Sequence, residues 1–295
     1  MGLVDLHLHS IYSDGYYKPS KLIKKAARLG LKLVSLTDHD SVSGVDEAIR
    51  SANDLGIECL TGIEITTDAP YEQHILGYMV DINDSGFKKF IKELMRLRDL
   101  RAEAVFGYLD SKGKGLDEDD VRKFANGSYI GRPHFAHALM ARGVVDSVNE
   151  AFDEYLSNYM LRDIPRPKID VKEAIDAILT AGGSAVLAHP HTLRIKGERM
   201  PADELDKVIG NLCEMGLCGI ECNYYNYEPE QVREYTALAE RHDLVVTGGS
   251  DFHGGNVKPG VEIGSGKNGL LRFDDMEVAT KLTAKAAGNR DGSFV

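Results

Sequence analysis

The chain has 295 residues, 43% of them hydrophobic, and a formal net charge of −11 at pH 7, so it is long and apolar enough for one large α/β domain or a domain with an insert. The negative charge argues against duplex DNA and anionic membranes as partners, because both require a broad basic surface. No segment approaches the roughly 18 consecutive apolar residues of a transmembrane helix.

The first expected strand, close to the N-terminus, contains an unusual pair of histidines. His7 and His9 alternate with Leu6 and Leu8, so on a strand the two imidazoles lie on one face and the two leucines on the other. Asp14 follows in a turn rich in Ser, Asp and Gly. An apolar strand has no packing reason to place two histidines on one face. Because imidazole nitrogen is a favoured ligand of divalent transition metals, the motif predicts a metal centre.

Most of the later apolar segments also end in histidine or an acid. Strands are expected within 33–40, 58–67, 73–80, 184–190, 219–224 and 244–253. The polar residues in or just after them are Asp38, His39, Asp40, Glu64, His74, His189, Glu221, Asp251 and His253. In α/β barrels, functional groups gather at the carboxyl ends of the strands, so we expect most of these side chains to meet at one barrel mouth.

Helical patterns separate the strands, with helices expected at 19–29, 44–55, 171–181, 202–215 and 228–242. This alternation predicts a mostly parallel α/β sheet or barrel with seven strands. One connection differs, because only about three residues (68–70) separate the third strand from the fourth, whereas a parallel crossover needs about a dozen. We therefore expect these two strands to form a hairpin that returns His74 to the end of the barrel where Glu64 lies.

A helical insert is expected at residues 84–160, between two barrel segments at 1–83 and 161–295. Its helices are predicted at 87–109, 116–124, 134–142 and 148–155, and a last helix follows at 275–287. The four cysteines include no CxxC pair, and a strand begins almost at once, which leaves no room for a signal peptide. These features predict a cytoplasmic protein with reduced thiols.

The motifs HLHSIYSDG, LTDHDSVSG, GIE, HILGY, RPHF, AHP, GIE and GSDFH, in this order, resemble the PHP (polymerase and histidinol phosphatase) family of metal-dependent phosphoesterases. The resemblance spans essentially the whole chain. The insert with RPHF is similar to the branch that includes nucleotide 3′,5′-bisphosphate phosphatases and cyclic-phosphate dihydrolases. The resemblance implies a distorted (βα)7 TIM-like barrel, which agrees with the strand count, and an insert that caps the substrate.

The resemblance also implies two or three divalent metal ions. The ligand types do not choose among manganese, iron and zinc. The first ion is expected at His7, His9, Glu64 and Asp251. The second is expected to share Glu64 and to add His74 and His134. The third is expected at Asp14, His39 and His253. No ligand is missing, which argues against an inactive relative.

Such a centre suits phosphate chemistry, because metal-bound water loses its proton near neutral pH and can attack phosphorus in line. His189 and Asp251 are the expected catalytic residues, and His189 either binds the phosphate or acts as general acid. Arg132 is expected to clamp a phosphate, although a surface ion pair is the alternative. Arg194, in a basic loop with Lys196, is expected either to contact a second phosphate or to be solvated.

The expected substrate is a small phosphate ester, such as a nucleotide or sugar phosphate. Monoesters and cyclic diesters need the same metals, so the sequence does not separate them. One alternative is an exonuclease that trims RNA ends or short oligonucleotides, which the acidic charge does not exclude. A second alternative is a non-catalytic module that the metals only stabilise.

Overall fold

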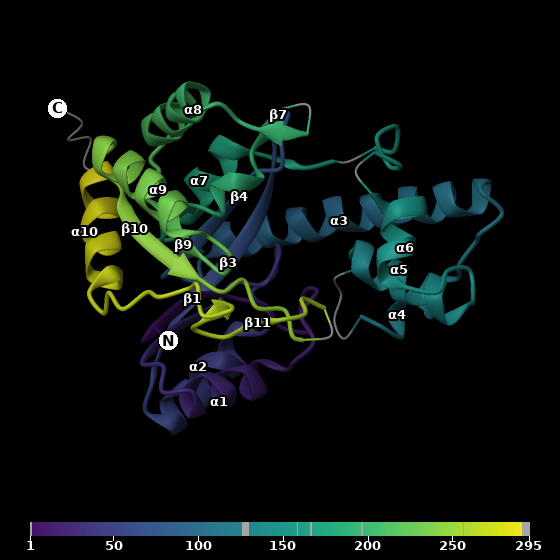
Figure 1. Ribbon diagram of the computed structural model, residues 1–295, viewed down its shortest axis with the longest axis horizontal. Helices are drawn as coiled ribbons and strands as arrows, with labels where there is room; N and C mark the ends of the chain where they lie inside the picture. Colours follow the sequence, from purple (N-terminus) through teal and green to yellow (C-terminus); the bar gives the residue numbers. More distant parts are fainter. Residues whose placement is uncertain are drawn as a thin grey trace.

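The computed structural model describes residues 2–125, 130–157, 159–165, 167–195, 197–255 and 257–290. Within them, seven strands form a nearly closed barrel in the order β1-β2-β3-β4-β6-β9-β10, which confirms the expected fold class (Figure 1). The strands are β1 (Val4–Leu8), β2 (Leu33–Leu36), β3 (Glu58–Asp68), β4 (His74–Tyr78), β6 (Ser184–Leu187), β9 (Gly219–Tyr224) and β10 (Val245–Gly249). The short β5 (Ile169–Asp170) pairs with the end of β3, outside this path.

The β3–β4 hairpin is the antiparallel element of the barrel, as its short connection predicts. Glu64 pairs with Leu76, and Thr66 pairs with His74. β4 is also antiparallel to β6, whereas β1–β2, β2–β3, β6–β9 and β9–β10 are parallel. The start of β4 therefore lies at the same end of the barrel as the carboxyl ends of its parallel neighbours, and His74 lies there with them.

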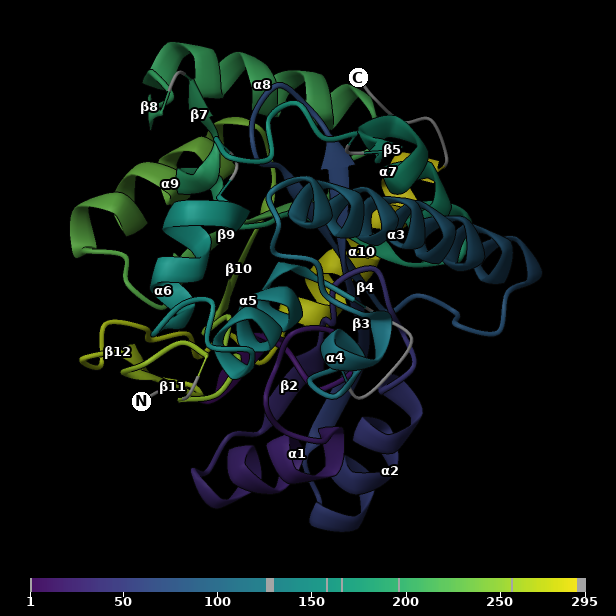
Figure 2. The ribbon, with the colours of Figure 1, turned by 90° about the vertical axis from the view of Figure 1, so that its right-hand side faces the viewer.

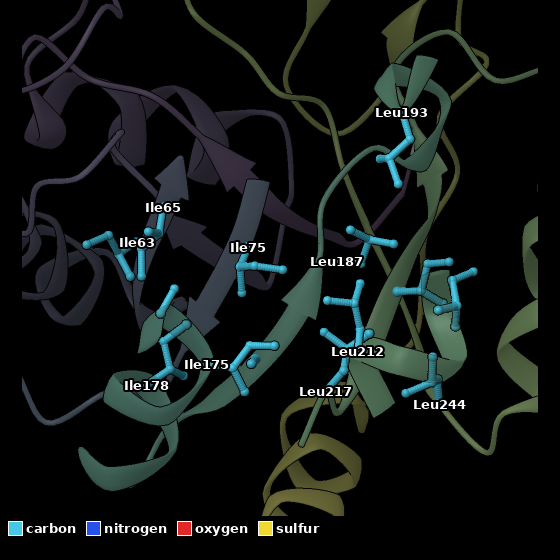
Figure 3. Close-up of a cluster of buried hydrophobic side chains, with 14 of the residues drawn as sticks. Ile63, Ile65, Ile75, Ile175, Ile178, Leu187, Leu193, Leu212, Leu217 and Leu244 are labelled. Atoms are coloured by element: carbon cyan, nitrogen blue, oxygen red, sulfur yellow. The ribbon is translucent and has the colours of Figure 1, made fainter. Parts of the chain in front are cut away.

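Six helices pack around the barrel: α1 (Pro19–Arg28), α2 (Val45–Leu55), α7 (Val171–Thr180), α8 (Ala202–Glu214), α9 (Pro229–Arg241) and α10 (Val278–Arg290) (Figure 1). Their apolar faces pack against the strands. Figure 3 shows Ile175 and Ile178 of α7 beside Ile63 of β3 and Ile75 of β4, all of them fully buried. Gly56 ends α2 in the left-handed conformation, at φ 69°, that a residue with a side chain rarely adopts.

The insert projects from the side of the barrel on the 27-residue helix α3 (Ser85–Ser111) (Figures 1 and 2). Its shorter helices are α4 (Glu118–Arg122), α5 (Arg132–Ala141) and α6 (Val148–Ala151), the last followed by a π-helical turn at Phe152–Leu156. The far half of α3 packs with them around an apolar core of the insert's own, which includes Val105, Phe135 and Leu139. α5 begins two residues earlier than expected, because Pro133 is well suited to the first turn of a helix.

The remaining elements are small. They are the hairpins β7 (Arg194–Ile195) with β8 (Glu198–Arg199) and β11 (Val261–Glu262) with β12 (Gly266–Lys267), and a 3-10 turn at Pro190–Thr192. Among the residues described, no helix is both long enough and apolar enough to cross a membrane.

Asp5 bridges β1 to the segments beyond β10, where the barrel closes. Its Oδ1 accepts a hydrogen bond from the Ser250 amide at 2.8 Å, and its Oδ2 accepts one from the Gly264 amide at 2.8 Å. The side chain is fully buried. The sequence motifs did not single out this acid, because its partners lie about 250 residues away.

Replacing Asp5 by alanine is expected to destabilise the protein by about 2–4 kcal/mol, because it leaves buried amide groups without an acceptor. Urea unfolding followed by circular dichroism measures the change. Asp54→Ala, on the exposed side of α2, is the matched control and should change stability little. Equal stability of the two variants would contradict the role assigned to Asp5.

Candidate metal centre

The carboxyl ends of the parallel strands bring a dense cluster of imidazoles and carboxylates to one barrel mouth. It contains His7, His9, Asp14, His39, Glu64, His74, His189, Asp251 and His253. Their side chains are buried or nearly so. Residues from seven separate segments of the chain thus converge, as the strand-end pattern predicts.

Glu64 lies at the centre of this cluster. Its Oε1 is 2.8 Å from His74 Nδ1 and 2.8 Å from His189 Nε2. Its Oε2 is 3.1 to 3.3 Å from three further ring nitrogens, which are His39 Nδ1, His9 Nε2 and His7 Nε2. One carboxylate therefore faces five imidazoles, with each oxygen turned toward a different subset.

Two more carboxylates complete the cluster. Asp251 Oδ1 lies 3.2 Å from His9 Nε2 and 3.4 Å from His253 Nδ1. Asp14 Oδ1 lies 3.2 Å from His253 Nε2, and Asp14 Oδ2 lies 3.8 Å from His39 Nε2. Glu64, Asp14 and Asp251 thus form a chain of acids linked by shared histidines.

Several polar atoms at the centre of this cluster are buried without a hydrogen-bond partner. They are His7 Nε2, His9 Nε2, Asp14 Oδ1, His39 Nδ1 and Glu64 Oε2. Buried polar atoms in folded proteins nearly always have a partner, because an unsatisfied one is costly. These atoms converge with spacings that suit shared cations, and nitrogen and carboxylate oxygen are ligands of zinc, manganese and iron. The residues present therefore fit divalent metal ions.

The electrostatics of the cluster keep its acids ionised. Burial raises the pKa of Glu64, but the imidazoles of His39 and His7 outweigh burial and bring that pKa well below its ordinary value. The pKa of Asp14 is likewise well below its ordinary value, because His253 and His39 outweigh burial. Burial lowers the pKa of His39 itself, which favours the neutral imidazole that binds metals. Glu221 and Glu64 in turn outweigh burial and raise the pKa of His7 well above its ordinary value, and Asp251 and Glu64 raise the pKa of His9 to about 9, so the mouth pairs ionised acids with cationic imidazoles.

Three of the described non-glycine residues with positive φ lie at the barrel mouth. His189, Asp251 and Asp40 follow β6, β10 and β2, and their φ angles are +24°, +48° and +51°. Residues other than glycine rarely adopt positive φ, and such strain concentrates at functional sites. Here it marks two members of the cluster, together with Asp40, whose carboxylate contacts the insert.

Buried acids around the cluster orient its members. Glu221 Oε1 is hydrogen-bonded to His7 Nδ1 at 2.9 Å, and its Oε2 accepts from the His189 amide at 2.8 Å. Asp38 accepts from the Ser10 amide at 2.6 Å and from Ser13 Oγ at 2.7 Å. Glu221 therefore turns the free ring nitrogen of His7 toward Glu64, and Asp38 shapes the loop that leads to Asp14.

A cavity of about 310 Å³ lies between the barrel mouth and the insert. Asp14, His39 and His74 line it on the barrel side. The opposite walls contain four cationic residues, Arg98, Arg101, Arg132 and Lys168, and apolar residues that include Leu94, Leu97, Val105, Phe135 and Phe152. Two acids, Asp40 and Glu72, also line the cavity, which thus combines charged and apolar surface beside the cluster.

Contacts across the cavity rim fix the positions of these cations. Arg98 Nε donates to Asp40 Oδ2 at 2.5 Å, and its Nη2 donates to Thr66 Oγ1 at 3.0 Å. Lys168 Nζ donates to the Thr67 carbonyl at 2.9 Å. The sequence motifs missed Arg98, Arg101 and Lys168, because nothing local to helix α3 or to the return segment signals which barrel residues they face.

Arg132 lines this cavity, and its guanidinium lies 5.7 Å from the centre of the Phe152 ring. His134 is buried at the start of α5, where its Nδ1 accepts from the Gly131 amide at 3.0 Å, and burial lowers its pKa to about 4. Among the described residues, the side chains of the cluster fall into four groups that are close enough to hold a metal ion, and His134 belongs to none of them. Arg194 is exposed on the β7–β8 hairpin, is not among the cavity-lining residues, and donates to the Gly197 carbonyl at 3.1 Å. Lys196 lies outside the described residues.

Comparison with protein families places this centre in a known class. The model of the PHP domain matches residues 5–159, more than half of the chain and the part that contains the first six members of the cluster. The chain belongs to the PHP family. This confirms the resemblance seen in the motifs.

Similar PHP proteins extend the match over nearly the whole chain. A 5′-3′ exoribonuclease of Haemophilus influenzae is 31% identical over 84% of this chain and 89% of its own length. A 3′,5′-nucleoside bisphosphate phosphatase of Chromobacterium violaceum is 30% identical over 86% of this chain and 88% of its own. A Bifidobacterium adolescentis structure described as a metal-dependent phosphoesterase superposes with a TM-score of 0.81 at 32% identity and covers 96% of both chains. The expected enzyme class, a phosphoric ester hydrolase, is confirmed.

Proposed function

We propose that this PHP phosphoesterase hydrolyses phosphate esters of small molecules that have a second anionic group, such as nucleotide bisphosphates or sugar phosphates. The observation that supports this proposal is the 310 Å³ cavity, whose lining includes three members of the cluster and four cations, one of them, Arg98, paired with Asp40. One end of a small substrate would face the metals while its other end faces the arginines and Lys168.

In this proposal three sets of residues hold divalent ions. His7, His9, Glu64 and Asp251 form the first, and Asp14, His39 and His253 form the third. In the second set, Glu64 and His74 act with His189 in place of the expected His134, because His189 Nε2 lies 2.8 Å from Glu64 Oε1. When bound, such ions supply a hydroxide nucleophile at neutral pH and stabilise the charge that develops on phosphorus.

The chain's own residues bind and orient the substrate. Arg132 and its neighbours offer charge-assisted hydrogen bonds to phosphate oxygens. The Phe152 side of the cavity offers an apolar surface to a base or sugar. His189 is already engaged at both ring nitrogens, with Nδ1 at 3.0 Å from Thr192 Oγ1 and Nε2 beside Glu64. The Thr192 contact orients the ring so that Nε2 faces the same oxygen of Glu64 as His74 Nδ1, which is the basis for placing His189 in the second set.

The names of the two sequence relatives support two related substrates. The Chromobacterium violaceum phosphatase acts on nucleoside bisphosphates, which have the second anionic group of the proposed substrate. The Haemophilus influenzae relative acts on RNA from the 5′ end, so trimming of short oligoribonucleotides is the second candidate. The acidic charge of the chain disfavours long RNA.

A substrate panel tests the proposal. Protein reconstituted with manganese, iron or zinc is expected to release inorganic phosphate from adenosine 3′,5′-bisphosphate with a higher kcat/KM than it releases mononucleotides from a 5′-phosphorylated oligoribonucleotide. A ribose cyclic phosphate completes the panel, and His9→Ala is the control for contaminating phosphatases. Preference for the oligoribonucleotide would favour the second candidate. Lack of turnover with every ester and metal would defeat both.

A further inference from the structure

Lys258 is a cation at the edge of the metal centre that neither the motifs nor the proposed mechanism uses. Its Nζ donates to Asp251 Oδ2 and lies 3.4 Å from the Asp251 carbonyl oxygen. The ammonium also lies 4.7 Å from the centre of the Tyr225 ring, and the side chain is only 28% exposed. A partly buried ammonium requires a compensating interaction, because charged groups are costly to bury.

The two oxygens of Asp251 face different partners. Oδ1 faces the ring nitrogens of the cluster, at 3.2 Å from His9 Nε2 and 3.6 Å from His7 Nε2. Oδ2 accepts from Lys258 and from the Tyr224 hydroxyl. An ion ligated through Oδ1 would therefore share this carboxylate with the ammonium.

The charges around Asp251 determine how Lys258 affects the stability of the metal-free protein and the affinity for a metal ion. Without a metal, the Asp251 carboxylate has the ammonium of Lys258 at Oδ2 and the rings of His9 and His253 at Oδ1, so Lys258 balances part of its charge. A divalent cation held by Oδ1 would share this carboxylate with the ammonium at Oδ2, and the two positive charges would repel each other. Poor solvation makes both interactions strong, because a low effective dielectric strengthens them.

We infer that Lys258 is a built-in counter-cation that stabilises the metal-free protein and weakens binding of the metal ion next to Asp251. This inference rests on the metal centre of the proposed function. Lys258 thus lowers the affinity for this ion through Asp251, so that the ion at that position stays exchangeable.

The test compares Lys258→Met, which removes the charge, with Lys258→Arg, which keeps it. The dissociation constant for Mn²⁺ is measured by competition with a fluorescent chelator, and the melting temperature of the metal-free protein is measured by circular dichroism. We expect Lys258→Met to bind at least one Mn²⁺ ion about tenfold more strongly than the wild type and to melt at a lower temperature without metal. Lys258→Arg should resemble the wild type in both measurements.

Control variants separate this role from simple packing. Lys281→Met, which removes an exposed ion pair with Asp275, should change neither quantity much. Lys258→Gln, which keeps a hydrogen-bond donor without the charge, should reproduce the tighter binding even if Lys258→Met folds poorly. A lower melting temperature with an unchanged or weaker affinity for Mn²⁺ would show a merely structural role and overturn the inference. If the wild type binds Mn²⁺ but cleaves no phosphate ester, the proposed function fails, and the dissociation constants still decide the role of Lys258.

Discussion

Glu64→Gln is expected to lose most of its bound metal and to lower kcat by about four orders of magnitude, since metal-activated water and metal-stabilised charge together supply several kcal/mol of catalysis. The physical reason is the position of Glu64, whose two oxygens face five imidazoles. An amide lacks the negative charge and has only one acceptor oxygen, so it cannot serve two neighbouring cations. Metal content by elemental analysis and kcat with saturating substrate measure the two effects.

The matched control lies on the same strand. Glu58→Gln changes an exposed acid at the other end of β3 and should leave metal content and kcat close to the wild-type values. Circular dichroism shows whether Glu64→Gln keeps its fold. A folded Glu64→Gln variant with a full metal complement would contradict the central position that we assign to this carboxylate.

Local sequence patterns predicted much of the fold and of the cluster, for a definite reason. Strand alternation decides which side chains share a face, and parallel strands place all their carboxyl ends at one mouth. Those two rules were enough to bring His7, His39 and Asp251 together. The short β3–β4 connection then required a hairpin, and the hairpin explains why His74 joins them from the start of its strand.

The insert was harder to predict at the level of side chains. Its helices were recognised from their periodicity, but their packing on the barrel mouth depends on contacts between distant segments. Arg98 reaches Asp40 across 58 positions of sequence, and Lys168 reaches Thr67 across 101. No pattern within a helix states which of its polar residues will face a cavity. Arg132 and His134 were proposed only through their shared motif, and His134 Nδ1 accepts from the backbone amide of Gly131 at the start of α5.

Replacing Arg98 by methionine is expected to raise the KM for a nucleoside bisphosphate by about 10- to 100-fold, because a charge-assisted hydrogen bond contributes about 1.5–3 kcal/mol. The guanidinium is fixed by Asp40 and Thr66 at the cavity wall, so its charge is in place before the substrate arrives. Its guanidinium contacts Asp40 and Thr66, which are neighbours of the cluster and not members of it, so kcat should fall less than KM rises. Steady-state kinetics with the bisphosphate and with a simple monoester measure the difference.

The comparison of substrates and variants decides what Arg98 recognises. Arg96→Met, two positions earlier on α3, removes an exposed ion pair with Glu93 and should leave both constants unchanged. Arg98→Lys keeps the charge and should recover part of the affinity. If Arg98 serves only to dock the insert on the barrel, Arg98→Met would impair the monoester and the bisphosphate equally. A KM effect confined to the bisphosphate therefore distinguishes recognition of a second anionic group from a general weakening of the contact between insert and barrel. Substrate choice would then depend on a residue of the insert, while the proposed metal ligands lie on the barrel.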